Sequence, residues 1–185
     1  MKHVQKTLES AVGLTTMDKE EKLIDYITKE EISNTPENRE AKVVFEKRLH
    51  EEYGYSLDQM LPEFRIKKGS TLIGPADIVV FHDPKNKTQD NIHIIVECKR
   101  KNRTDGIEQL KTYLAGCESA EYGVWFNGDD IEYINRLKKP PHWKRTFNIP
   151  RFGEKLGLPR KDSLKPATEL VKVFETCHNH IYAND

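Results

Sequence analysis

The stretch IHIIVECK, residues 92–99, decides the fold class of this 185-residue chain. Its first five residues are mostly β-branched, which is typical of a strand. A nearly continuous apolar run of this kind predicts a strand that is covered on both faces of a sheet. The run then ends in two charged residues, Glu97 and Lys99, which are costly beside a core unless their charges are paired or used. The stretch therefore predicts a buried sheet with a candidate functional site at the end of one strand.

Similar apolar runs on either side predict the rest of the sheet. Residues 64–66 and 76–81 precede the central stretch, and residues 122–127 and 131–134 follow it. Residues 83–87, rich in Pro, Asn and Asp, predict a loop between two of these strands. The pair Gly128-Asp129 predicts a turn that makes the last two strands a hairpin. The class is therefore α/β, with helices covering the sheet.

Helices are predicted from apolar periodicity and from capping residues. Residues 17–32 predict an amphipathic helix, and Thr35-Pro36 predicts the start of a second helix that ends near Gly54. A third helix is predicted to begin at Thr104 or Asp105. The apolar stripes of the second and third helices are Ala41, Val44, Phe45 and Leu49, and Ile107, Leu110, Leu114 and Cys117.

The C-terminal third carries weaker signals. Residues 137–165 are rich in Pro, Lys and Arg and predict an irregular linker. A final amphipathic helix is predicted beyond it, on Leu170, Val173, Phe174, Cys177 and Ile181. The expected organisation is therefore an N-terminal helical segment (1–33), a core (34–136), and a linker with a C-terminal helix (137–185) that leads to a further domain.

The composition indicates the compartment in which the protein is expected and the partners that it can bind. The formal net charge is zero and hydrophobic residues make up 36% of the chain. No apolar run approaches the roughly 20 residues that span a bilayer, and no secretory signal is present, so a cytoplasmic protein without a membrane partner is expected. The three cysteines are widely spaced and are expected to be reduced. Because net charge is zero, any binding of DNA would need cations gathered on one face, such as the run at residues 99–103.

The chemistry-bearing residues are Asp77, Glu97 and Lys99. Residues two apart in a strand face the same side, so Glu97 and Lys99 point together while Cys98 points away. Asp77 lies in a strand that can pair beside them. Two carboxylates, with the Cys98 backbone carbonyl as a third oxygen, suit Mg²⁺, which prefers hard oxygen ligands. The alternative interpretation is a structural salt bridge at a strand end.

The motifs arrive in an ordered series. GPADIVVF at residues 74–81, IVECK at 95–99 and QLKTY at 109–113 resemble motifs II and III and the QxxxY signature of the PD-(D/E)XK superfamily. Residues 44–55 and 123–128 also resemble its RecB-like QxxxY subgroup. The series resembles the N-terminal nuclease domain of the R proteins of Type I restriction enzymes (HSDR_N-like). One departure is that Ala76 precedes the acid, with Pro75 one position further back.

The resemblance implies a restriction-endonuclease-like core with a central mixed sheet flanked by helices. It also implies Asp77, Glu97, Lys99, Gln109 and Tyr113 as catalytic-site residues, and Mg²⁺ as cofactor with Mn²⁺ able to substitute. Glu40 of the first core helix is the further metal ligand expected, with Glu37 nearly as well placed. The residues expected to contact DNA are Arg100, Lys101, Arg103, Gln109 and Tyr113.

The expected function is cleavage of foreign double-stranded DNA by a Mg²⁺-dependent endonuclease of a Type I restriction-modification R protein. Its expected partners are a translocase and/or a methyltransferase, and a specificity subunit. No Walker A pattern is present in the sequence, so ATP is expected to act only through a translocase domain outside this chain. Two alternatives remain open: a non-catalytic DNA-binding or docking module, and a repair nuclease or junction resolvase of the same superfamily.

Overall fold

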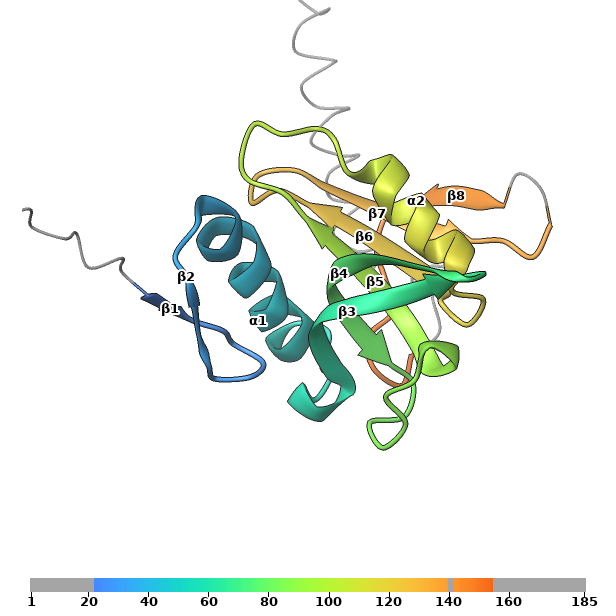
Figure 1. The fold of residues 1–185 in the computed structure, drawn as a ribbon, viewed down its shortest axis with the longest axis horizontal. Coiled ribbons are helices and arrows are strands. Elements are labelled where there is room, and N and C mark those ends of the chain that lie inside the picture. Colours follow the sequence, from blue (N-terminus) through green and yellow to red (C-terminus); the bar gives the residue numbers. More distant parts are fainter. Residues whose placement is uncertain (1–21, 140–141, 155–185) are drawn as a thin grey trace, which may run out of the picture.

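The computed structural model describes residues 22–139 and 142–154. In that part of the chain, six strands form one sheet in the order β3-β4-β5-β6-β7-β8, and β1 pairs with β2 in a separate hairpin (Figure 1). The elements are β1 (Lys22–Ile24), β2 (Glu31–Ser33), η1 (Asn38–Lys42), α1 (Val43–Glu51), η2 (Leu57–Gln59), β3 (Met60–Lys68), β4 (Thr71–Phe81), η3 (Gln89–Asn91), β5 (Ile92–Cys98), α2 (Ile107–Gly116), β6 (Tyr122–Phe126), β7 (Ile131–Arg136) and β8 (Trp143–Thr146).

The sheet is mixed because β5 and β6 run parallel while every other neighbouring pair is antiparallel. Parallel strands need a crossover connection, and α2 supplies it. The helix lies close against β6, since a Cβ at Gly123 would come within 2.7 Å of Leu114 Cδ1. The predicted α/β class, with a central mixed sheet and helices on it, is confirmed.

The two helices cover opposite faces of the sheet (Figure 1). α1 contributes Phe45 and Leu49 to one apolar cluster, and α2 contributes Leu110 and Leu114 to the other. All of β5 except His93 is buried, which explains its nearly continuous apolar sequence. None of the described helices is long and apolar enough to cross a membrane.

The first core helix begins as predicted. The Thr35 hydroxyl accepts a hydrogen bond from the Asn38 N–H at 3.1 Å, which is the geometry of a helix N-cap. The helix passes through the π-helical segment η1 before it becomes α1. One prediction for its apolar stripe is wrong: Val44 is 40% exposed, and the buried flank is the opposite one, which carries Lys42 and Glu46. The buried stripe follows the four-residue spacing of Ala41, Phe45 and Leu49, which leaves Val44 on the side.

The predicted N-terminal helix over residues 17–32 is wrong where the structure describes it. Residues 22–33 form the antiparallel hairpin β1–β2 instead, with Leu23 opposite Ile32. The Asp25 side chain holds the turn, because its Oδ1 accepts the N–H groups of Ile27 and Thr28 at 3.0 and 2.8 Å. An Asp that bonds to its own backbone in this way favours a turn over a helix. Residues 17–21 lie outside the described residues.

The predicted linker after Arg136 is also different. Residues 143–146 form β8, which pairs with β7 and extends the sheet beyond Arg136. The chain then crosses the apolar cluster beneath α1, where Ile149 is 2% exposed. Tyr53 and Tyr55 hold this crossing: their hydroxyls donate to Asn148 Oδ1 at 2.5 Å and to the Pro150 carbonyl at 2.9 Å. The predicted C-terminal helix lies outside the described residues.

The caps of α2 require one more correction. Neither Thr104 nor Asp105 caps the helix with its side chain; the N-cap residue is Gly106, in a left-handed conformation at φ 108°. The Asp105 carboxylate pairs instead with the Arg103 guanidinium. The helix therefore begins at a backbone conformation that glycine adopts most easily.

A buried acid on α1 makes stability depend on pH. Glu46 is 0% exposed, and burial together with the nearby Asp25 charge raises the pKa of its carboxyl from 4.5 to about 8. Because the folded state holds this proton more tightly than the unfolded state, the stability contribution of the group falls as pH rises from about 4.5 to about 8.

We therefore expect Glu46→Gln to raise the free energy of unfolding at pH 9 by on the order of 1–3 kcal/mol, and to change it little at pH 5. The amide keeps an oxygen for the Tyr26 N–H that Glu46 now accepts. Urea unfolding at both pH values is the measurement, with Glu51→Gln on the exposed side of the same helix as control. An equal effect of Glu46→Gln at pH 5 and pH 9 would contradict the protonated carboxyl.

Candidate active site

The site lies where two central strands part. The last paired residues of β4 and β5 are Ile78 and Val96, so Asp77 and Glu97 are the next positions on the two strands. The Asp77 carboxylate bridges the opening, because its Oδ2 accepts the backbone N–H of Cys98 at 2.6 Å. The two acids predicted from sequence are therefore brought together at one end of the strand pair.

Glu97 and Lys99 point to the same side, as their spacing predicted, and their side chains form a hydrogen-bonded ion pair. Cys98 points away into the apolar cluster beneath α1. Glu97 is 1% exposed, and its second oxygen, Oε2, has no hydrogen-bond partner among the described residues. Such an orphaned buried carboxylate oxygen calls for an explanation, and a bound cation is one.

The electrostatics of the two acids agree with this geometry. Burial raises the pKa of Asp77 to about 6, against the opposing effects of the Cys98 N–H and of Lys99. Burial, and then the Asp77 charge, raise the pKa of Glu97 to about 8, while Lys99 opposes the shift. Two carboxylates that share a buried position disfavour each other's ionised form. A cation between them would remove that penalty.

The side chains available as ligands limit which metal ion the site can hold. Within residues 22–139 and 142–154, no group of three or more His, Cys, Asp or Glu side chains is arranged to hold a metal ion. The side-chain donors are therefore two carboxylates, which is a poor set for Zn²⁺ and a suitable one for Mg²⁺, an ion that keeps several of its waters.

Of the two first-helix acids considered for the metal, Glu37 is the one whose charge acts on this pair. The charge of Glu37 raises the pKa of both Asp77 and Glu97. Glu40 bonds to the Arg39 guanidinium at 3.0 Å. The electrostatics thus favour Glu37, which the sequence placed nearly as well as Glu40, and Glu40 stays a prediction.

Gln109 and Tyr113 lie together on α2 as predicted, and they reach the strand that carries Asp77. Gln109 Nε2 donates to the Tyr113 hydroxyl at 2.6 Å, and that hydroxyl donates to the Pro75 carbonyl at 3.1 Å. Tyr113 is 3% exposed and belongs to the apolar cluster beneath α2, so it is part of the buried face of the helix. The pair fixes the backbone two residues before Asp77.

The predicted basic run is less available than its sequence indicates. Lys101 pairs with Asp129 at 3.0 Å, and Arg103 pairs with Asp105 at 2.6 Å. Arg100 is exposed, and it forms no ion pair with the described residues. Residues 99–103 contain four cations, but the partners of Lys101 and Arg103 reduce the net positive charge that this loop presents to solvent.

Three residues that sequence reasoning did not assign to the site hold the loop after Lys99. The Trp125 indole N–H donates to the Asp105 carbonyl at 2.8 Å, and Asn127 Nδ2 donates to the Arg103 carbonyl at 3.0 Å. Gly106 lies against the Lys99 side chain, where an added Cβ would be 3.0 Å from Lys99 Cε and 3.0 Å from Trp125 Nε1. Trp125 and Asn127 lie in the stretch GVWFNG at residues 123–128. That stretch resembled the family, but the sequence assigned no role to its side chains.

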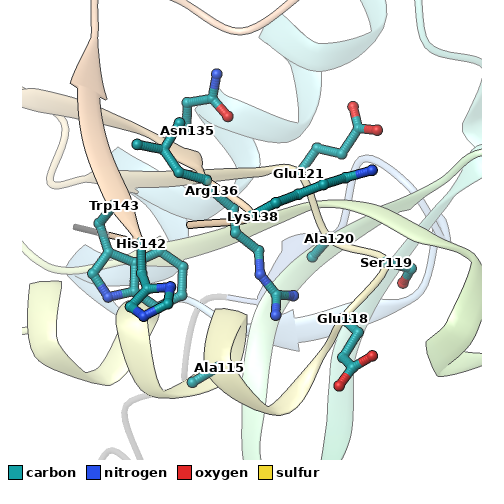
Figure 2. A pocket seen from close by; sticks show the side chains of 11 residues that line it. Ala115, Glu118, Ser119, Ala120, Glu121, Asn135, Arg136, Lys138, His142 and Trp143 are labelled. Atoms are coloured by element: carbon teal, nitrogen blue, oxygen red, sulfur yellow. The ribbon is translucent and has the colours of Figure 1, made fainter. Parts of the chain in front are cut away.

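A separate hollow of about 810 Å³ lies at the other end of α2 (Figure 2). Its lining mixes the acids Glu118 and Glu121 with the cations Arg136 and Lys138. Arg136 is already used there, because its Nη1 donates to the Cys117 carbonyl at the end of the helix. None of the residues predicted to be functional lines this hollow, so the candidate site is the one at Asp77 and Glu97.

Comparison with known proteins agrees with the order of the motifs. Residues 39–150, more than half of the chain, match the family described as Type I restriction enzyme R protein N terminus (HSDR_N). The chain belongs to this family. Membership places it in a restriction system, and the match includes Asp77, Glu97, Lys99, Gln109 and Tyr113. No curated protein and no solved structure matches the chain.

The contact between Gly106 and Lys99 leads to a test in this HSDR_N domain. We expect Gly106→Ala to lower the free energy of unfolding by roughly 1–3 kcal/mol more than Gly69→Ala. Both glycines have positive φ, but a Cβ at Gly69 would meet nothing within 4 Å. Urea unfolding followed by tryptophan fluorescence measures the difference. Equal losses in the two variants would contradict the close approach of Gly106 to Lys99 and Trp125.

Proposed function

We propose that this chain is a Mg²⁺-dependent DNA endonuclease domain with a core of the PD-(D/E)XK type, which contributes cleavage of foreign DNA to a Type I restriction system. The observation that carries the proposal is the buried Glu97 Oε2, which has no hydrogen-bond partner in the described part of the chain and lies beside Asp77 where β4 and β5 separate. The family match and the Lys99 ammonium next to Glu97 support it.

In this proposal the Asp77 and Glu97 carboxylates and the Cys98 carbonyl hold the metal. When bound, Mg²⁺ acidifies a water and neutralises charge on the phosphate. Lys99 lies on the same side as Glu97, where its ammonium can orient the attacking water or stabilise negative charge that develops on the phosphate. Hydrolysis joins the water oxygen to phosphorus and breaks one bond from phosphorus to a sugar oxygen.

The residues around these three have positioning roles. Tyr113 and Gln109 fix the Pro75 carbonyl, and Trp125 and Asn127 fix the loop that follows Lys99. Phosphate contacts by Arg100, Lys101, Arg103 and Gln109 would position DNA without reading its sequence. Tyr113 is 3% exposed and its hydroxyl bonds to the Pro75 carbonyl, so its proposed role is positioning rather than contact with DNA. For Lys101 and Arg103 such contacts would compete with Asp129 and Asp105.

A second candidate function is a docking module that has the same fold and does not cut. The zero net charge and the local pairing of Lys101 and Arg103 favour it, because both weaken DNA binding by charge alone. Metal binding separates the two candidates, since a docking module has no use for a site at Asp77 and Glu97.

Isothermal titration of Mn²⁺ into the wild-type protein and into Glu97→Gln is the first test of the nuclease proposal. We expect binding to the wild type and a loss of at least tenfold in affinity with Gln, because the amide removes a charged ligand. Glu132→Gln is the matched control, since Glu132 lies opposite Trp125 on β7, two strands from Glu97. Equal Mn²⁺ binding by wild type and Glu97→Gln would overturn the assignment, as would full metal-dependent DNA cleavage by Asp77→Ala.

The affinity for Mn²⁺ is also expected to rise with pH. Metal binding requires both acids to lose their protons, and burial raises the pKa of Asp77 to about 6 and that of Glu97 to about 8. Affinity should therefore increase from pH 5 through pH 8 and level off about one unit above the pKa of Glu97. Titration in buffers of different ionisation enthalpy should show proton release at pH 7. A pH-independent affinity between pH 6 and pH 8 would contradict the raised pKa values.

A further inference from the structure

A lysine is buried between two acids from different parts of the fold. Lys42, at the end of η1, is only 4% exposed. Its Nζ is 3.0 Å from Glu63 Oε1 on β3 and 3.5 Å from Asp25 Oδ2 in the turn of the β1–β2 hairpin. Asp25 is 1% exposed, whereas Glu63 is 54% exposed at its side chain. A buried lysine is costly unless it is well paired. Burial lowers the pKa of Lys42, and the charges of Glu63, Glu46 and Asp25 raise it.

Glu63 occupies a special position on β3. Its neighbours Pro62 and Phe64 pair with Ile78 and Ala76, so Glu63 lies directly opposite Asp77 on β4. Its backbone φ is 56°, which is unusual for a residue other than glycine and is costly unless other contacts hold it. The ladder then shifts register between Phe64 and Ile66. In this conformation the Glu63 carboxylate accepts a hydrogen bond from Lys42 Nζ at 3.0 Å.

Like charges directly opposite each other on neighbouring strands are destabilising. Glu63 and Asp77 would be such a pair if both carboxylates pointed the same way. The buried Lys42 ammonium attracts the Glu63 carboxylate, and the left-handed backbone of Glu63 redirects its side chain. The Asp77 carboxylate is thereby left to bond with the Cys98 N–H at 2.6 Å.

We propose that Lys42 and Glu63 are a positioning pair that holds Asp77 in its place beside Glu97, and that the N-terminal hairpin belongs to the same unit because Asp25 is the second partner of Lys42. The proposal deepens the proposed metal site and rests on it for its meaning in catalysis. Neither Lys42 nor Glu63 needs to touch the substrate. The family match begins at residue 39, so it includes Lys42 and Glu63 and leaves the hairpin outside.

The test uses the Cys98 amide as a reporter in metal-free protein, since Asp77 is its acceptor. In Glu63→Gln we expect hydrogen exchange at the Cys98 N–H to become roughly tenfold faster, with the Val124 amide of β6 as the internal reference. Loss of a nearby negative charge by itself also speeds hydroxide-catalysed exchange, so a charge control is needed. Glu37→Gln is that control, because the Glu37 charge raises the pKa of Asp77 as the Glu63 charge does. Exchange at Cys98 that is no faster in Glu63→Gln than in Glu37→Gln overturns the proposal.

Lys42→Met gives a second test, in which charge alone and lost positioning change the Mn²⁺ affinity in opposite directions. Removal of a nearby positive charge should tighten Mn²⁺ binding if charge alone matters. Lost positioning should weaken it, and we expect a weakening of roughly tenfold, as for other partners of metal ligands. Lys22→Met is the matched control, because it breaks an exposed ion pair with Glu31 in the same hairpin without touching Lys42. Unchanged or tighter Mn²⁺ binding by Lys42→Met overturns the positioning role.

The contribution of the hairpin is tested with Asp25→Asn. The amide oxygen can still accept the Ile27 and Thr28 N–H groups, so the turn is kept while the charge facing Lys42 is lost. We expect faster Cys98 exchange than in the wild type, by a smaller factor than in Glu63→Gln. Exchange equal to the wild type would exclude the hairpin from the unit. If the wild type binds no Mn²⁺, the metal-site proposal fails, while the exchange measurements still decide the positioning proposal.

Discussion

The structure depends on one hydrogen bond at the place where β4 leaves β5. Asp77 Oδ2 accepts the Cys98 N–H, so the side chain of one strand replaces the backbone partner that the other strand has lost. A strand end inside a core would otherwise leave an unpaired backbone donor, which is costly. The same contact fixes Asp77 beside Glu97. The hydrogen bond that satisfies the backbone at the end of β5 is therefore the same one that places Asp77 in the site.

Around that bond, charge is arranged in two buried groups on either side of Cys98. Asp77, Glu97 and Lys99 form one group, and Asp25, Lys42 and Glu46 form the other beneath α1. Burial of so many ionisable groups costs stability unless each has a role or a partner. The second group joins the N-terminal hairpin to the core.

Local patterns in the sequence predicted most of the sheet and the central acids. Strand alternation is a local property, so the spacing of Glu97 and Lys99 is enough by itself to place both on one side of β5. β8 was missed because Lys144 and Arg145 are exposed on an edge strand, where polar residues hide the pattern. The choice between Glu37 and Glu40 could not be made, and Lys42 could not be assigned, because the face that a helix presents to a strand end depends on tertiary packing. A lysine in a helix is usually solvated, and nothing near Lys42 in the sequence shows that it is buried.

The crossing of residues 147–150 has a consequence for where this fold can be divided. The hydroxyls of Tyr53 and Tyr55 donate to Asn148 and Pro150, and Ile149 fills the apolar cluster beneath α1. A protein cut after Arg136, at the edge of the apparent motif series, would expose that cluster. It would also leave the Tyr55 hydroxyl without its acceptor and the Tyr53 hydroxyl with Tyr133 as its remaining partner. The contacts of Tyr53 and Tyr55 therefore make residues 147–150 part of this domain. A domain border drawn from the motifs alone would fall inside the hydrophobic core.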